Sequence, residues 1–197
     1  VRGKVSLKAD EYLEKIQSRV KRMVAMIDGI LAYSQVEQDL SGQQRTIDVG
    51  KLLHNVLDLL ALPADVSVEI MPEMPTLEVN PVKLSQVFSN LIGNAAKYRN
   101  PEHCKIVIKW QNKASFFEFS VSDNGPGISP QYHDKVFGVF QTFNSNPEVE
   151  SSGVGLAIVK KIIEARGGSI TLESTLGEGA SFRFLWPKEA VNTSEGQ

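Results

Sequence analysis

In residues 86–99, QVFSNLIGNAAKYR, apolar side chains recur every three or four positions. This spacing predicts an amphipathic helix that buries one face. Asn90, Asn94 and Lys97 are also three and four positions apart, so they share the neighbouring stripe. An amide oxygen is a suitable ligand for Mg²⁺ beside phosphate oxygens and water, and a lysine ammonium attracts phosphate. The stripe therefore suits a metal-bound polyphosphate. The alternative is an ordinary amphipathic helix whose polar edge carries asparagine.

The composition indicates a globular chain of nearly neutral charge. Of its 197 residues 42% are hydrophobic, and the formal net charge is -2 without a basic block, so nucleic acid is a poor candidate partner. Cys104 is the only cysteine, which excludes an intrachain disulfide and suits a reducing, cytoplasmic compartment. No apolar run approaches membrane-spanning length and no signal peptide is evident. Because the chain starts with Val1, we expect a longer protein whose upstream part could carry a sensor or a membrane tether.

Residues 7–38 are predicted to form one long helix. Its apolar stripe steps by three and then four residues, through Leu13, Ile16, Val20, Met23, Ile27, Ile30 and Ser34. This heptad-like pattern is typical of a bundle or coiled coil, so we expect residues 1–40 to associate with a second copy. The alternative is a helix that docks on its own domain. Residues 41–46 are polar and are predicted to be a linker.

Residues 47–190 are predicted to form one α+β domain, followed by a loose tail at 191–197. Helices are predicted over residues 49–62, from Pro81 onward, over 130–137 and over 154–165, and strands over 66–70, 77–79, 105–110, 116–122, 169–173 and 181–186. Asn80 suits the cap of the helix that starts at Pro81. Since most of the strands follow one another as hairpins, we expect a sandwich with helices on one face of a mixed sheet.

A second group of candidate residues, Asp123-Asn124-Gly125-Pro126-Gly127-Ile128, follows an apolar strand. Its two glycines let the backbone turn sharply and approach a flat ligand. A carboxylate at a buried strand end needs a hydrogen-bond donor. The exocyclic amine of adenine supplies one, whereas the keto oxygen of guanine would repel the carboxylate. The alternative is a simple turn.

A third group, residues 151–157 (SSGVGLA), opens the helix predicted over 154–165. Backbone N–H groups at a helix start can bind phosphate when glycines such as Gly153 and Gly155 leave them accessible. The preceding Gln141–Glu150 is polar and has no apolar period, so we interpret it as a lid over bound nucleotide; the alternative is a surface loop. Three phenylalanines would anchor the base of this lid, although core packing explains them equally well: Phe137, Phe140 and Phe143.

Together these groups resemble the sequence boxes of sensor histidine kinases. Residues 90–99, 123–128, 137–143, 153–157 and 177–182 match, in order and spacing, the boxes called N, G1, F, G2 and G3. The resemblance covers residues 50–187. Residues 7–38 look like the second helix of the family's dimerisation and histidine-phosphotransfer domain. The segment RMVAMIDGILAYSQVE (residues 22–37) is most similar to the corresponding segment of kinases with phytochrome or PAS-type sensors.

The resemblance implies the Bergerat ATP-binding fold, with ATP and Mg²⁺ as cofactors. Asn94 would hold Mg²⁺, Asn90 would lie near the phosphates and Lys97 would contact phosphate, and these three form the implied catalytic group. Tyr98 would line the pocket and Asp123 would bind the adenine amine. The other implied nucleotide contacts are Gly125, Gly127, Ile128, Phe140, Ser152, Gly153, Val154, Gly155, Leu156 and Ser181. The phosphoryl group would pass from ATP to a histidine and then to an aspartate of a response-regulator receiver domain.

Two features depart from the family pattern. The phosphate loop often reads G-T-G-x-G-L, whereas this chain has Ser151 at the first position, so the lid could close less freely. The phosphorylated histidine of the family lies on a helix before the long helix, and the histidines here are His54, His103 and His133. We interpret all three as surface residues. We therefore expect the acceptor histidine upstream of this chain.

Two alternative functions share the fold. ATP-hydrolysing clamps of the gyrase or mismatch-repair type place a glutamate base four residues before the metal-binding asparagine, but here that position is Asn90, which cannot deprotonate water. A non-catalytic adenine-binding module, or a serine kinase of the anti-sigma type, is the other alternative. The long helix argues against the anti-sigma type, and the intact boxes argue against an inactive module.

Overall fold

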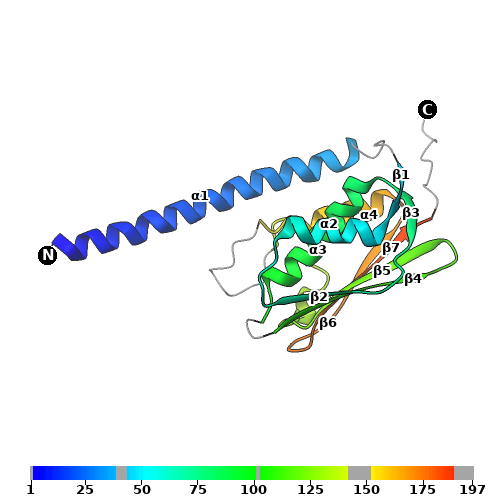
Figure 1. Cartoon of the computed structure of the whole chain (residues 1–197). Helices are drawn as coiled ribbons and strands as arrows, with labels where there is room; N and C mark the ends of the chain where they lie inside the picture. Colours follow the sequence, from blue (N-terminus) through cyan, green and yellow to red (C-terminus); the bar gives the residue numbers. More distant parts are fainter. Residues whose placement is uncertain (1, 39–43, 101–102, 142–151, 189–197) are drawn as a thin grey trace.

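The computed structural model describes residues 2–38, 44–100, 103–141 and 152–188 (Figure 1). The helices are α1 (Arg2–Gln38), α2 (Val49–Leu60), α3 (Pro81–Lys97), the short 3₁₀ helix η1 (Pro130–Tyr132) and α4 (Gly155–Ala165). The strands are β1 (Arg45–Asp48), β2 (Val66–Ile70), β3 (Thr76–Val79), β4 (Cys104–Asn112), β5 (Phe116–Asp123), β6 (Ser169–Thr175) and β7 (Gly179–Pro187). Among the described residues, no helix combines the length and the apolar character needed to span a membrane.

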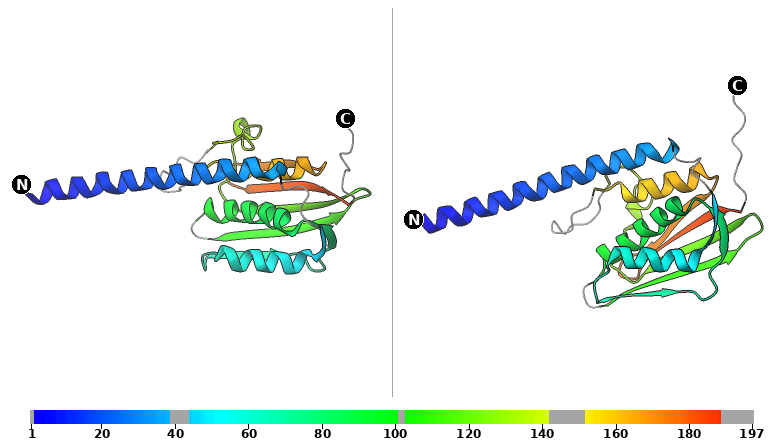
Figure 2. Two further views of the ribbon diagram at one scale, coloured as in Figure 1. Left: turned by 90° about the horizontal axis from the view of Figure 1, so that it is seen from above. Right: turned by 45° about the horizontal axis from the view of Figure 1, so that its top comes forward.

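A five-stranded sheet forms one layer, and α2, α3 and α4 lie side by side on one of its faces (Figures 1 and 2). The strand order is β2-β4-β5-β7-β6; β2 and β4 are parallel, and the other neighbours are antiparallel. The short strands β1 and β3 pair separately. This arrangement confirms the predicted α+β sandwich with a mixed sheet.

Helix α3 is the central helix of this layer, and aromatic packing fixes it on the sheet. Asn80 caps its start by accepting hydrogen bonds from the N–H groups of Val82 (3.0 Å) and Lys83 (3.3 Å). Phe88 is fully buried and its ring meets those of Phe119 and Phe184 edge-on, with both centroids 5.6 Å away. The buried face therefore holds the neighbouring polar stripe of α3 at a fixed height above β5 and β7.

The C-terminal part of α1 docks on α4. Val36 is fully buried, and the ammonium of Lys161 lies 4.2 Å from the ring centroid of Tyr33. Gly29 makes this approach possible, because a Cβ at this position would lie 2.9 Å from Cγ2 of Val154. The alternative that the sequence left open, a helix docked on its own domain, therefore holds for the last turns of α1.

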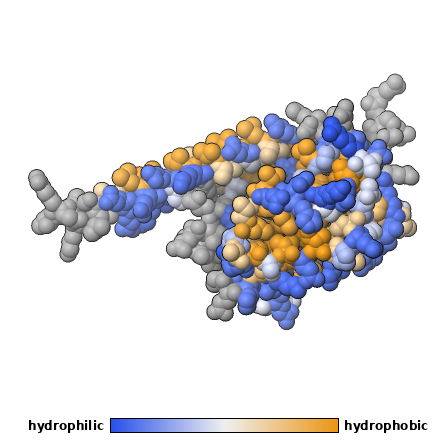
Figure 3. Space-filling model, in the orientation of Figure 1, coloured by the Kyte–Doolittle hydropathy of each residue, from blue (hydrophilic) through white to orange (hydrophobic). Residues whose placement is uncertain are grey.

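The heptad stripe of α1 is free of such contacts among the described residues, and it lies on the opposite side of the helix. At 100° per residue, the mean direction of the docked positions 29, 33 and 36 is about 150° away from that of positions 20, 27 and 34. The apolar residues of the stripe are 48–60% exposed: Leu13, Ile16, Val20, Met23, Ile27 and Ile30. Figure 3 shows apolar side chains along the upper edge of α1. Docking on α4 thus leaves the stripe available.

Several local expectations differ from the structure. Arg45 and Thr46, within the predicted linker, belong to β1, because they pair with β3 at Val79 and Glu78. The helix predicted over 130–137 shortens to η1, which ends at Tyr132. Residues 41–43 of the linker, the lid beyond Gln141 (including Phe143), Ser151 and the tail 191–197 lie outside the described residues.

Candidate functional site

A cavity of about 590 Å³ lies between α3, the start of α4, the loop after β5 and the start of β7. Its volume is within the usual range of small-molecule sites. The structure brings the three sequence groups together here. The predicted site residues that line the cavity are Asn90, Asn94, Lys97, Tyr98, Asp123, Gly127, Ile128, Ser152, Gly153, Gly155 and Leu156.

The polar stripe of α3 faces this cavity, and its two asparagines differ in their contacts. The side-chain amide of Asn94 makes no hydrogen bond within the described residues, so its oxygen can bind a metal ion. Asn90 donates its amide N–H to the carbonyl of Gln86 (2.8 Å). This turns its oxygen toward Gly155, where a Cβ would lie 2.7 Å from it. Asn90 therefore positions the start of α4 as well as lining the cavity.

The start of α4 presents backbone N–H groups to the cavity. Among the residues that the structure describes, no side chain caps this helix, whose N-cap residue is Val154. Gly153 precedes it with a φ of 68°, and a Cβ there would lie 2.8–2.9 Å from the backbone of Phe140 and Gln141. Since the first N–H groups of a helix lack helical partners, this end is suited to an anion such as phosphate.

Asp123 lies at the end of β5 and supplies the carboxylate in the described lining of the cavity. Burial raises its pKa above the usual range, while backbone N–H groups of Gly125 and Ala180 act in the opposite direction by favouring the charged form. The N–H of Gly125 donates to Oδ1 over 2.9 Å. One oxygen is thus held by the protein, and the carboxylate can accept a further hydrogen bond from a ligand amine.

Four predicted contacts do not line the cavity. Ser181 points to the outer face of the sheet, where its hydroxyl shares a hydrogen bond of 2.8 Å with that of Ser122. Successive side chains of a strand alternate between faces, so its neighbours face the cavity instead. Phe140 is 43% exposed at the cavity's margin. Val154 is buried beneath α1, and Gly125 is buried beside the carboxylate of Asp123.

Sequence reasoning missed part of the lining. These residues are Ala95, Pro126, Ser129, Tyr132, Val136, Gln141, Leu176, Ala180 and Phe182. Strand alternation from Asp123 across to β7 could have identified Ala180 and Phe182. Leu176 had no local signal, because it reaches the cavity from the turn between β6 and β7.

The histidines lie outside the cavity lining. His54 and His103 are exposed, as predicted. His133 is half-buried rather than fully on the surface, because its Nε2 lies 2.8 Å from the carbonyl oxygen of Ile128 in a hydrogen bond. Neither the hydrogen bond of His133 nor the exposed positions of His54 and His103 suggest a phosphate acceptor.

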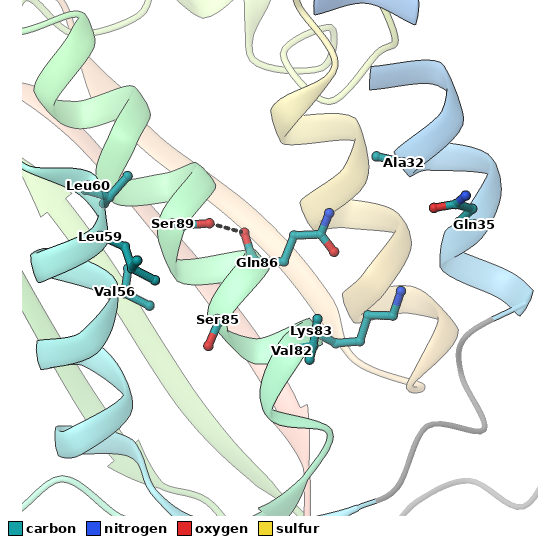
Figure 4. A pocket seen from close by; sticks show the side chains of 10 residues that line it. All are labelled: Ala32, Gln35, Val56, Leu59, Leu60, Val82, Lys83, Ser85, Gln86 and Ser89. Carbon is teal, nitrogen blue, oxygen red and sulfur yellow. Dashed lines mark hydrogen bonds between the residues drawn. The ribbon is translucent and has the colours of Figure 1, made fainter. Parts of the chain in front are cut away.

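A second cavity of about 430 Å³ lies between α1, α2 and α3 (Figure 4). Apolar side chains such as Val56 and Leu59 line one side, and uncharged polar side chains such as Gln35 and Gln86 line the other. Lys83 is the one charged residue among its described lining. This surface offers no group of residues suited to catalysis.

Comparison with known proteins places the chain in a protein family. The sequence profile described as "Histidine kinase-, DNA gyrase B-, and HSP90-like ATPase" matches residues 79–190, which include the candidate site residues of all three groups. The chain belongs to this family. Within it, the chain is of the histidine kinase type, since the relatives found over most of its length are sensor kinases and its fold is that of their catalytic domains.

Individual relatives agree with this assignment. Cyanobacterial phytochrome A of Nostoc sp. is 40% identical over 181 residues, which are 91% of this chain and 24% of that protein. The methanogenesis regulatory histidine kinase FilI of Methanothrix harundinacea is 31% identical, over 89% of this chain and 20% of that kinase. The catalytic domain of histidine kinase ThkA has a TM-score of 0.60 at 26% identity, over 75% of this chain and 99% of that domain. The chain thus spans about a quarter or less of the full length of cyanobacterial phytochrome A and of FilI.

The residues present fit a metal held jointly with phosphates rather than a metal held by the protein alone. In the described parts of the chain, no three His, Cys, Asp or Glu side chains gather as a metal site. Asn94 offers one neutral oxygen to the cavity. Mg²⁺ commonly takes one or two protein oxygens together with substrate phosphates and water.

Proposed function

We propose that this chain binds ATP with Mg²⁺ and transfers the γ-phosphoryl group to a histidine outside this chain's 197 residues. The observation that carries the proposal is that Asn94, Lys97, Asp123 and the uncapped start of α4 meet in one cavity. One end of the cavity offers an acceptor for an amine. The other end offers positive potential for phosphate and a hard oxygen atom for a metal ion. A purine nucleoside triphosphate with bound magnesium matches both ends.

Each residue has a distinct task in this proposal. Asp123 accepts the adenine amine and disfavours guanine. Lys97 and the first N–H groups of α4 neutralise phosphate charge. Asn94 would supply one ligand to Mg²⁺, and the ion would offset the negative charge that develops on the phosphates. The protein needs no nucleophile of its own in the cavity, because a nitrogen of the acceptor imidazole attacks the γ-phosphorus while the bond to the β–γ bridging oxygen breaks and ADP leaves.

Dimerisation through α1 belongs to the same proposal. The exposed stripe of α1 lies opposite the face that docks on α4, so one helix can pair with a second copy while it holds its catalytic domain. Val20→Asp would place a charge in this stripe and should abolish self-association in sedimentation velocity. Ser18→Asp, on the side of the helix opposite Val20, is the matched control and should leave association unchanged. A wild-type chain that stays monomeric at high concentration would contradict this part.

The catalytic part is tested with a longer form of the protein that includes the residues preceding Val1. Incubation with γ-labelled ATP and Mg²⁺ should yield an acid-labile phosphohistidine, and the label should then pass to the aspartate of a cognate response-regulator receiver domain. Asn94→Ala should remove the labelling without unfolding the chain. Labelling that persists in Asn94→Ala would show that another residue holds the metal, and ATP hydrolysis without any phosphohistidine would favour a clamp-type ATPase.

A further inference from the structure

One hydroxyl group links the loop after β5 to the hairpin formed by β6 and β7. The Oγ of Ser174 accepts a hydrogen bond from the N–H of Ile128 (2.8 Å) and donates one to the carbonyl of Gly179 (2.7 Å). The direction of both bonds is determined by chemistry, because a backbone N–H only donates and a carbonyl only accepts. Ser174 and Ile128 are half-buried, and Gly179 is buried.

Ser174 stands in line with Asp123 across three strands. It pairs with Ala180 of β7, and Ala180 pairs with Asp123 of β5. Residues at paired positions point to the same face of a sheet, so all three side chains lie on the helix-covered side. The serine is thus two strands away from the carboxylate and cannot act through direct contact with it.

Close backbone packing makes the loop dependent on the hairpin. A Cβ on Gly127 would lie 2.1 Å from the carbonyl oxygen of Thr175, and one on Gly179 would lie 1.9 Å from the carbonyl oxygen of Asp123. The N–H of Gly177 also donates to the carbonyl of Pro126 over 2.8 Å. Among these links, the one at Ser174 is made by a side chain and can be removed without changing a backbone conformation.

We propose that Ser174 is a positioning residue for the base of the bound nucleotide. It holds Ile128 in place, and Pro126, Gly127 and Ile128 line the cavity directly after Asp123. Without the hydroxyl, the N–H of Ile128 loses its acceptor and the loop must move toward water to find another. The wall beside the base then loosens, while the phosphate end, which rests on α3 and α4, keeps its geometry.

This inference rests on the proposed binding of ATP, and the experiment separates the two. Calorimetry compares ATP and ADP binding to the wild type and to Ser174→Ala, Ser174→Thr and Ser174→Val. Threonine keeps the hydroxyl, whereas valine has nearly the same shape without it. The matched control is Ser67→Ala, because Ser67 also lies on an edge strand and donates to a neighbouring carbonyl, that of Cys104 (3.1 Å), but contacts no cavity loop.

We expect Ser174→Ala and Ser174→Val to weaken both nucleotides by the same factor, about tenfold, the usual order for one buried group left without its partner. Ser174→Thr should bind nearly as the wild type does, and Ser67→Ala should not change. Hydrogen exchange of the Ile128 amide in the nucleotide-free chain should be faster in Ser174→Ala and Ser174→Val alone.

Three results would overturn the inference. The first is a Ser174→Ala variant that binds both nucleotides as the wild type does. The second is a loss of affinity for ATP but not for ADP, which would place the effect at the γ-phosphate. The third is equal behaviour of the threonine and valine variants, which would make packing rather than the hydroxyl responsible. A wild-type chain that binds neither nucleotide would instead refute the proposed function.

Discussion

The substitution Asp123→Asn should separate nucleotide binding from stability. The N–H of Gly125 donates to Oδ1 of Asp123 over 2.9 Å, and the N–H of Ala180 also favours the charged carboxylate. In the variant, the amide oxygen must face the N–H of Gly125, because an amide NH₂ cannot accept from it. The NH₂ group then faces the adenine amine, so two donors oppose each other where the wild type has a donor and an acceptor.

The expected loss follows from these contacts. A hydrogen bond to a charged acceptor contributes about 1.5–3 kcal/mol, and the adenine amine that is left buried without a partner adds a cost of similar size. At the lower end of both ranges the total is about 3 kcal/mol, so the affinity for ATP should be at least about 100-fold weaker.

The stability of the nucleotide-free chain should change in the opposite direction. Burial raises the pKa of Asp123 above its value in an unfolded chain. A raised carboxyl pKa means that the folded state binds the proton more tightly, so ionisation at neutral pH costs stability. A neutral amide avoids this cost, and the variant should therefore melt no lower than the wild type, and higher if the amide keeps its backbone contacts.

Calorimetry measures the affinity and thermal denaturation measures the stability. Asp65→Asn is the matched control, because the hydrogen bond and charge of Arg99 lower the pKa of Asp65 instead of raising it. This control should keep its affinity for ATP and should not gain stability at neutral pH. The reasoning would be refuted if Asp123→Asn bound ATP as the wild type does, or if it lost affinity only because it no longer folded.

Four further predictions concern the site and its supports. Wild-type affinity for ATP should fall as the pH is lowered through the raised pKa of Asp123, because the protonated acid is a poorer acceptor; calorimetry on Asp123→Asn should show a flat profile. Asn94→Ala should make ATP binding insensitive to Mg²⁺ in titrations with and without a chelator, and a retained response would assign the metal elsewhere. Gly29→Leu should release α1 from α4 and speed amide exchange at the start of α4, since a Cβ at position 29 would lie 2.9 Å from Cγ2 of Val154. Leucine favours helix, so the effect would not come from unfolding of α1 itself. Unchanged exchange would argue against the contact. Phe184→Ala should lower the free energy of unfolding by about 3–5 kcal/mol in urea denaturation, because the ring is fully buried in the aromatic cluster of α3 and the sheet; a loss below about 1 kcal/mol would contradict that packing.

Local sequence signals were sufficient for most of the fold. The apolar period around Phe88 and the cap at Asn80 predicted α3, and alternation predicted the long strands. Strand β1 could not be found in this way, because Arg45–Asp48 is short, polar on most positions and becomes a strand only by pairing with β3. Such a pairing depends on residues about thirty positions away, which no local pattern contains.

The candidate site was predictable where a residue's type determines its task, and less so where geometry does. Asn94, Lys97 and Asp123 line one cavity, and their roles toward metal, phosphate and base stay predictions. Ser181 does not line the cavity, because the register of β7 decides which face a side chain occupies, and Ala180 faces the cavity instead. The supporting role of Ser174 could not be deduced from its own strand, since its hydrogen-bond partners come from the loop after β5 and from β7.

The central claim is that one cavity binds the base at Asp123 and the metal-bound phosphates at Asn94. A crystal structure of the chain with Mg²⁺ and a non-hydrolysable ATP analogue tests it most directly. The account predicts the adenine amine within hydrogen-bonding distance of the Asp123 carboxylate and the side-chain oxygen of Asn94 among the ligands of Mg²⁺. A nucleotide bound elsewhere, or one bound in the cavity with its base turned away from Asp123, would contradict it.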